Sequence, residues 1–154
     1  MNDHEIDVEL CCATAGCPEP ALLISWAKQA LAGQTDVACS ISVRVVDDSE
    51  MTTLNLGYRS IDGTTNVLSF PCGINDENGR LMLGDILVCQ PQIQREALDQ
   101  GLPERDHWAH ILIHGVLHLL GHDHMEPEEA SVMEALEAQI LGELGIENPY
   151  GQVA

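Results

Sequence analysis

Apolar and polar residues follow one another along the chain in patterns that predict both strands and helices. Apolar residues that alternate with polar ones, or that form short runs between turn residues, indicate extended segments. The strands expected on this basis lie at residues 6–10, 41–46, 66–70, 81–83 and 85–89. Pro71 should stop the third of these strands, and Gly84 should mark a bulge between the last two. Residues 73–80 hold Gly, Asn and Asp and should form a loop or a hairpin connection.

Apolar residues that recur every three or four positions predict helices. The helices expected on this basis lie at residues 20–31, 51–56, 91–99, 105–120 and 127–144. Proline at the beginning favours the start of four of them, at Pro18 and Pro20, Pro91, Pro103 and Pro127, and Gly121 suits the end of the helix at 105–120. In the last helix the apolar residues should share one face, with glutamates opposite; they are Val132, Met133, Leu136, Ile140 and Leu144.

The order of these segments indicates the fold class. Strand, helix, strand and helix are followed by two or more strands and then by three helices. That order predicts an α+β domain in which a small mixed β-sheet is packed with helices. No internal repeat or long linker interrupts the chain, so residues 1–154 are expected to form a single domain.

The charge of the chain restricts its partners. The formal net charge is -19, from 25 acidic and 6 basic residues. This field repels polyanions and argues against broad, non-specific binding to DNA or RNA, whereas it attracts cations, metal ions included. A simpler interpretation is that the charge keeps the protein soluble.

The six cysteines and the absence of long apolar runs bear on the compartment. No two cysteines form a CxxC pair, which makes a zinc knuckle unfavourable. The sequence shows no signal peptide and no apolar run that could cross a membrane. A cytoplasmic protein with reduced, mostly buried thiols is therefore expected, although Cys11, Cys12 and Cys17 could instead bind a ligand.

Three histidines have a spacing typical of a catalytic metal site. His114 and His118 stand four residues apart, so on a helix they lie one turn apart on the same face. Gly121 can adopt a left-handed conformation and reverse the chain, which would return His124 to the same ion. Three neutral imidazoles suit zinc and leave a fourth position for water. The sequence thus predicts one divalent ion held by His114, His118 and His124.

The spacing matches that of the protease motif HExxHxxGxxH, with one departure. Gly115 stands where the proteases carry their glutamate base, so ordinary peptidase activity is doubtful. His122 competes with His124 for the third ligand position. His107 and His110 lie roughly on the same helix face as the pair and are expected to be solvated or packed side chains.

The segment His114 to His124 resembles the motif HGxLHLxGxDH of the YbeY family of bacterial rRNA-maturation endoribonucleases. Two further blocks agree with that family. Leu54-Asn55 with Tyr58-Arg59, followed by Thr65 to Pro71, is similar to its LN..YR…TDVLSFP segment, and Leu83 to Ile86 is similar to its LGDI. The blocks span residues 54 to 124, and together they are highly specific.

This resemblance implies an α+β fold with a zincin-like metal-binding helix and bend. It implies a single-strand-specific, metal-dependent endoribonuclease that acts in rRNA processing, at the 3′ end of 16S rRNA, and in ribosome quality control. It assigns catalytic roles to Arg59 and His114, and metal binding to His114, His118 and His124. Zn²⁺ is the expected cofactor, with nickel or another divalent metal as alternatives. The implied partners are rRNA and the ribosomal subunit or ribosome-associated proteins, with no DNA and no membrane.

Two features of this chain do not fit an RNA-cutting enzyme easily. Asn66 replaces the Asp that is usual in the family's TDVLSF block. The basic residues form no cluster; they are Lys28, Arg44, Arg59, Arg80, Arg95 and Arg105. Either the arginines converge on one cleft in the fold, or partners deliver the RNA, and binding of isolated RNA should be weak and sensitive to salt. The alternatives are a metal-dependent hydrolase of peptides or small substrates, and a non-catalytic ribosome-assembly factor with a structural metal.

Overall fold

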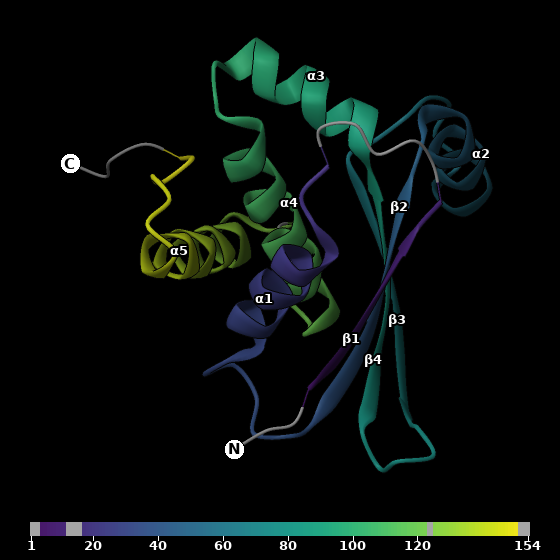
Figure 1. The fold of residues 1–154 in the computed structure, drawn as a ribbon, viewed down its shortest axis with the longest axis vertical. Helices are drawn as coiled ribbons and strands as arrows, with labels where there is room; N and C mark the ends of the chain where they lie inside the picture. Colours follow the sequence, from purple (N-terminus) through teal and green to yellow (C-terminus); the bar gives the residue numbers. More distant parts are fainter. Residues whose placement is uncertain (1–3, 12–16, 123–124, 151–154) are drawn as a thin grey trace.

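The protein is built around a four-stranded mixed sheet that separates helices on its two faces (Figure 1). The computed structural model describes residues 4–11, 17–122 and 125–150. The strand order is β1-β2-β4-β3, in which β1, β2 and β4 run parallel and β3 is antiparallel to β4. The predicted α+β class with a small mixed sheet is therefore confirmed.

The expected elements all form, most of them within a few residues of their predicted bounds. The strands are β1 (Glu5–Leu10), β2 (Cys39–Val46), β3 (Val67–Asn75) and β4 (Leu81–Cys89). The helices are α1 (Pro20–Leu31), α2 (Asp48–Arg59), α3 (Gln90–Gln100), α4 (Glu104–Leu119) and α5 (Pro127–Glu143). No helix in the described part of the chain has the length and apolar character required to cross a membrane.

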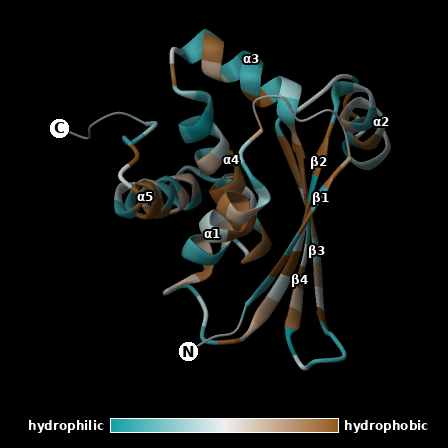
Figure 2. Cartoon of the chain, in the orientation of Figure 1, coloured by the Kyte–Doolittle hydropathy of each residue, from teal (hydrophilic) through white to brown (hydrophobic). Residues whose placement is uncertain are grey.

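The main hydrophobic core lies between the sheet and the pair α1 and α4, which contact each other (Figures 1 and 2). Trp26 of α1 and Trp108 of α4 are its largest side chains, and aliphatic residues fill the rest, as the low aromatic content requires. A smaller cluster, which includes Met51 and Leu68, fills the space between α2 and the opposite face. Helix α5 packs on α4. Helix α4 is therefore packed against the sheet and against α1, α3 and α5.

The structure corrects the prediction for Pro71. The third strand does not stop there but continues to Asn75, with a register shift between Pro71 and Ile74. Because β3 is an edge strand, a proline can be accommodated without the loss of a ladder hydrogen bond. The following turn closes a hairpin, in which Asp76 N–H donates to Arg80 O over 2.7 Å. The hairpin alternative for residues 73–80 is thus confirmed.

The bulge expected at Gly84 is present. The register between β2 and β4 shifts between Ser40 and Ile41, and Gly84 has a φ of 144°. A Cβ at this position would lie 2.1 Å from the backbone oxygen of Phe70, so only glycine fits between the two strands.

Two predictions about burial are wrong. In α5 the expected apolar face contains a glutamate: Glu137 is fully buried, whereas Val132 is 56% exposed. Among the described cysteines, only Cys39 and Cys89 are buried, and Cys72 is exposed, so the thiols are not mostly buried.

Candidate active site

The second half of α4 carries the two histidines that the sequence places one turn apart. His114 and His118 are half-buried, whereas the residues between them, Gly115 to Leu117, are buried. The helix ends as Gly121 predicts. Gly121 has a φ of 102°, its N–H donates to His118 O over 3.0 Å, and the N–H of His122 donates to Leu117 O over 3.1 Å. These two bonds form the Schellman motif, which reverses the chain directly after the histidine pair.

The predicted third ligand, His124, and the neighbouring Asp123 lie outside the described residues. His122, the alternative ligand, is half-buried after the turn. Within the part of the chain that the structure describes, no group of three His, Cys, Asp or Glu side chains is arranged to hold a metal ion. The choice between His122 and His124 therefore stays a prediction.

Gly115 allows α4 to approach the sheet closely. A Cβ there would lie 3.2 Å from Cγ2 of both Ile86 and Val67, which is closer than ordinary contact. The hydroxyl of Ser69 donates to the backbone oxygen of Gly115 over 3.2 Å and fixes β3 against the helix. Glycine at this position is explained by packing, since a glutamate base would not fit between helix and sheet.

A cleft of about 650 Å³ runs between β3 and the histidines of α4. Its described lining comprises Arg59, Thr65, Asn66, Val67, Leu68, Ser69, His114, His118 and Met125. The residues of the YR block, the TNVLS segment and the HGxLH motif, which are separated in the sequence, therefore meet along one cavity.

The last residue of α2 is Arg59, and a short loop leads from it to β3. The loop begins with Ser60 in a left-handed conformation at a φ of 56°. Asn55 is almost fully buried, and its side-chain amide donates to Gly63 O over 3.0 Å. This bond ties the loop to α2, so Asn55 of the LN block has a structural role in the segment that carries Arg59 to the cleft.

The backbone of β3 offers polar groups to the cleft. Cys89 N–H donates to Asn66 O over 2.9 Å, so Asn66 and Cys89 form a hydrogen-bonded pair of the antiparallel ladder. Such pairs alternate along the strands, hence Leu68 also turns its N–H and C=O toward β4. Val67 and Ser69 turn theirs toward the outer edge of the sheet, where no further strand of the described residues pairs with β3. Both residues line the cleft, which therefore has two backbone N–H donors on one wall.

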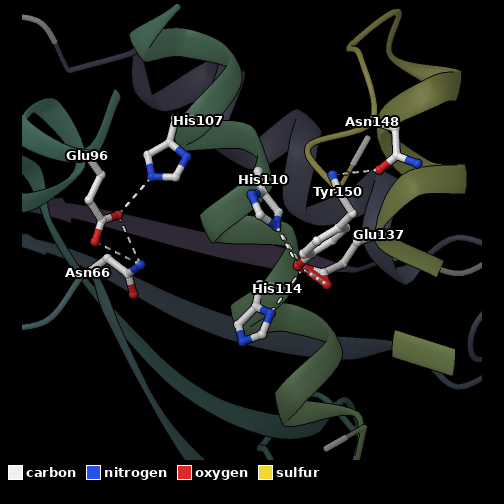
Figure 3. A network of polar contacts seen from close by, with 8 residues as sticks. All are labelled: Asn66, Glu96, His107, His110, His114, Glu137, Asn148 and Tyr150. Atoms are coloured by element: carbon white, nitrogen blue, oxygen red, sulfur yellow. Dashed lines mark hydrogen bonds and ion pairs between the residues drawn. The ribbon is translucent and has the colours of Figure 1, made fainter. Parts of the chain in front are cut away.

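Asn66 is anchored by the half-buried carboxylate of Glu96 (Figure 3). Its side-chain amide donates to Glu96 over 3.1 Å, Gln92 donates to the same carboxylate over 3.0 Å, and Nε2 of His107 lies 2.8 Å from it. Burial alone would raise the pKa of Glu96, but these hydrogen bonds and the nearby His107 outweigh it, so that its pKa is lowered. The amide of Asn66 supplies a donor that an aspartate would lack, and the substitution thereby fits its surroundings.

A second carboxylate, which is fully buried, contacts His114 of the cleft. Glu137 of α5 lies 3.1 Å from Nδ1 of His114 and 3.0 Å from Nε2 of His110. Neither Glu96 nor Glu137 was predicted from the sequence as part of the site. A signal was present for the latter, since Glu137 shares a helix face with Met133, Ile140 and Leu141, all of which are buried. His107 and His110, expected to be solvated or packed, are packed and hydrogen-bonded to these two carboxylates.

The arginines do not converge on the cleft. Three of them form ion pairs with carboxylates elsewhere. The distances from guanidinium nitrogen to carboxylate oxygen are 3.5 Å for Arg44 and Glu9, 3.1 Å for Arg80 and Glu5, and 2.7 Å for Arg95 and Asp48. Among the described residues, Arg59 alone of the basic side chains lines the cavity. The first of the two explanations for RNA binding by so acidic a chain is therefore wrong.

Comparisons with known proteins bear on the family and the fold of the chain. A family model described as Endoribonuclease YbeY matches residues 19–145. An endoribonuclease YbeY from Cellvibrio japonicus (strain Ueda107) is 44% identical over 154 residues, which is 100% of this chain and 87% of that protein. The solution structure of TM1509 from Thermotoga maritima is similar with a TM-score of 0.56 at 23% identity, over 96% of this chain and 99% of that one. The last comparison supports the α+β fold alone.

Proposed function

The chain belongs to the YbeY family of endoribonucleases, and on this premise we propose that it is a metal-dependent enzyme that cuts single-stranded RNA in the cleft between β3 and α4. The observation that carries the proposal is that Arg59, His114 and His118 line one cavity beside a free strand edge. Arginine, imidazole and backbone N–H groups are the partners that a phosphodiester requires for binding and charge stabilisation.

Arg59 is the proposed phosphate-binding residue. Its side chain is exposed and lines the cleft, and its planar guanidinium can donate two parallel hydrogen bonds to one phosphate. Its positive charge would also stabilise the negative charge that develops on the phosphate during cleavage. Lysine would keep this charge but would lose the two-pronged geometry.

The wall opposite the histidines suits a single strand of nucleic acid. Val67 and Ser69 direct their N–H groups toward the free edge, where they can donate to oxygens of an extended RNA backbone. A cavity of about 650 Å³ is of the size that holds small ligands and so accommodates only a few nucleotides. Duplex RNA is recognised across a broad groove and would not enter it.

The proposed cofactor is one zinc ion per chain, held by His114, His118 and His124. The donor set fits: two imidazoles line the cleft one turn apart, and His114 is hydrogen-bonded through Nδ1 to a buried carboxylate, as metal-binding histidines usually are. When bound, zinc supplies a Lewis acid toward a phosphoryl oxygen and lowers the pKa of water. His114 and His118 would orient this chemistry toward the phosphate that Arg59 binds.

We propose rRNA as the substrate, with maturation of the 3′ end of 16S rRNA and ribosome quality control in the cytoplasm as the processes. The resemblance to the family supports this, and so does the charge. A chain with a net charge of -19 and a single arginine in its cleft repels free polyanions, so a ribosomal subunit or a ribosome-associated protein would have to present the RNA. Because Arg59 would make a single phosphate contact, the affinity for isolated single-stranded RNA should be weak and should fall with rising salt at a slope of about -0.7.

The decisive experiment measures cleavage of a single-stranded RNA and the zinc content of the same preparations. The wild-type protein should contain one zinc ion and cut the RNA, and removal of zinc with a chelator should abolish cleavage until zinc is restored. Arg59→Ala should lower kcat/KM about 10²–10³-fold, with a smaller loss for Arg59→Lys. Arg105→Ala removes the same charge from an exposed position of α4 outside the cleft and serves as control. Equal losses in Arg59→Ala and Arg105→Ala would refute the role of Arg59.

The same assays separate the alternative functions. The free edge of β3 could also pair with an extended peptide, as in peptide-binding domains that add a strand, but Gly115 leaves no room for a glutamate base. Cleavage of a peptide library without cleavage of RNA would support the hydrolase alternative. Normal rRNA maturation with a folded His114→Ala/His118→Ala variant would support the assembly factor.

A further inference from the structure

Glu137 is a fully buried carboxylate whose surroundings are unusual for an acidic residue. It lies on α5, and none of its surface is accessible to solvent. Acidic side chains are rarely buried to this extent unless donors compensate for the lost water. Three donors do so here: Nε2 of His110 at 3.0 Å, Nδ1 of His114 at 3.1 Å, and the hydroxyl of Tyr150 at 3.0 Å (Figure 3).

The protonation of this carboxylate decides which atoms carry hydrogen. A carboxyl group is ionised at neutral pH, and the imidazole nitrogens and the hydroxyl that surround Glu137 are groups that can donate to an ionised carboxylate. An ionised carboxylate can only accept hydrogen bonds. Nδ1 of His114 must therefore carry a hydrogen, and in the neutral ring the lone pair lies on Nε2.

The direction of the ring follows from this contact. Figure 3 shows Nδ1 of His114 directed toward Glu137 and the other ring nitrogen directed away from it. His114 also lines the cleft, opposite the edge of β3. The two ring nitrogens thus face different surroundings, one a buried anion and the other the cavity.

We propose that Glu137 is a positioning residue for His114, which it holds in the Nδ1–H tautomer so that Nε2 presents its lone pair to the cleft. For the effect on zinc, this inference rests on the proposed function; for the tautomer, it does not. Partners of this kind typically change the metal affinity of the histidine they hold about 10–100-fold.

Tyr150 and His110 keep Glu137 in place. The hydroxyl of Tyr150 contacts both carboxylate oxygens, at 3.1 and 3.0 Å. The backbone N–H of Tyr150 donates to the side-chain oxygen of Asn148 over 2.9 Å. Burial and the charge of Glu137 raise the pKa of Tyr150, so the hydroxyl keeps its hydrogen and remains a donor. The segment after α5 is in this way attached to the carboxylate that orients His114.

A second carboxylate and histidine pair provides the matched control. Glu96 of α3 lies 2.8 Å from Nε2 of His107, which belongs to the same helix α4 as His114. Among the described interactions, Glu96 makes no contact with His114 itself. Glu96→Gln alters a comparable contact. It should change the signals of His107 and leave those of His114 unchanged.

The test is long-range ¹H–¹⁵N NMR of the ¹⁵N-histidine-labelled, metal-free protein, combined with zinc affinity from a competing chelator dye. The wild-type protein should show His114 as the Nδ1–H tautomer. Glu137→Leu should shift His114 toward a mixture of tautomers and weaken zinc binding about 10–100-fold. Glu137→Gln retains an acceptor oxygen and should lie between the two in both measurements. If Glu137→Leu does not fold, the comparison of Glu137→Gln and Tyr150→Phe with the wild-type protein decides.

The outcomes separate this inference from the proposed function. An Nε2–H tautomer of His114 in the wild-type protein overturns the inference, as do unchanged tautomer and zinc affinity in the Glu137 variants. Zinc binding that depends on Glu137, without any cleavage of RNA, overturns the proposed function and leaves the inference intact. A wild-type protein that binds no zinc overturns the proposed metal dependence of the enzyme and the proposed effect of Glu137 on zinc affinity. The NMR measurement then still tests whether Glu137 sets the tautomer of His114.

Discussion

Replacement of Gly115 by alanine tests how closely α4 approaches the sheet. In an exposed helix interior, the change from glycine to alanine stabilises a protein by about 0.8–1 kcal/mol, because glycine loses more backbone entropy on folding. Here the new Cβ would lie 3.2 Å from Cγ2 of Ile86 and of Val67. Both neighbours are β-branched and cannot easily rotate away, and Ile86 is fully buried. Such overpacking costs about 1–3 kcal/mol.

The difference of these two effects predicts a lower free energy of unfolding for Gly115→Ala, by about 0–2 kcal/mol. Gly142→Ala is the matched control, because Gly142 is also helical and exposed, and a Cβ there meets no atom within 4 Å. This variant should gain about 0.5–1 kcal/mol. With a urea m-value of about 2 kcal/mol/M, the unfolding midpoint should fall by up to about 1 M in the first variant and rise by about 0.3–0.5 M in the second.

Urea unfolding followed by circular dichroism measures both midpoints, and equal m-values show that the comparison is valid. If Gly115→Ala raised the midpoint as much as Gly142→Ala, the contacts with Ile86 and Val67 would not limit the approach of the helix. The explanation of the glycine in the HGxLH motif by packing would then be wrong.

Three further predictions concern the sheet and the half-buried carboxylate of Glu96. Gly84→Ala should yield no stably folded protein, because the new Cβ would lie 2.1 Å from the backbone oxygen of Phe70 and because the φ of 144° disfavours alanine. A soluble variant with a native-like circular dichroism spectrum would contradict this prediction. Asn66→Asp should lower the free energy of unfolding at pH 7 by about 1–3 kcal/mol, since Glu96 loses a donor and gains a neighbouring charge. This loss should shrink in mild acid, where one carboxyl binds a proton, and a loss independent of pH would refute the explanation. Because the pKa of Glu96 is lowered in the folded protein, its ionised form stabilises the fold at pH values above its unfolded pKa of about 4.3. This stabilisation is lost as the pH falls through the folded pKa. The free energy of unfolding of Glu96→Gln should therefore depend less on pH in this range than that of the wild-type protein.

Local patterns sufficed to predict the elements because periodicity and turn residues act over a few neighbouring positions. The period of apolar residues gave α4, and Gly121 gave the turn that ends it, which is the Schellman motif observed. Pro71 was misinterpreted for a physical reason. Whether a proline interrupts a strand depends on the position of that strand in the sheet, and the edge position of β3 follows from the strand order, which no local pattern contains.

The candidate site could be predicted in part. The family blocks brought Arg59, His114 and His118 together, as the cleft shows, whereas the functional roles of these residues stay predictions. Glu137 escaped notice because its partner His114 lies 23 residues away on another helix, and only the packing of α5 on α4 joins them. The sequence alone also did not show which carboxylate each arginine would contact in the folded protein.

The unpaired edge of β3 has a consequence for the solubility of the protein. An open strand edge is a template on which a second copy of the chain can add its own strand, the first step toward aggregation. Pro71 has no N–H and interrupts the row of outward N–H groups after Ser69, so the part of the edge that can pair with another strand is short. Mutual repulsion between copies adds protection at neutral pH, but it vanishes near the isoelectric point of about 4.3. Storage and crystallisation in acid would therefore favour precipitation that starts from the very edge where a substrate is expected to lie.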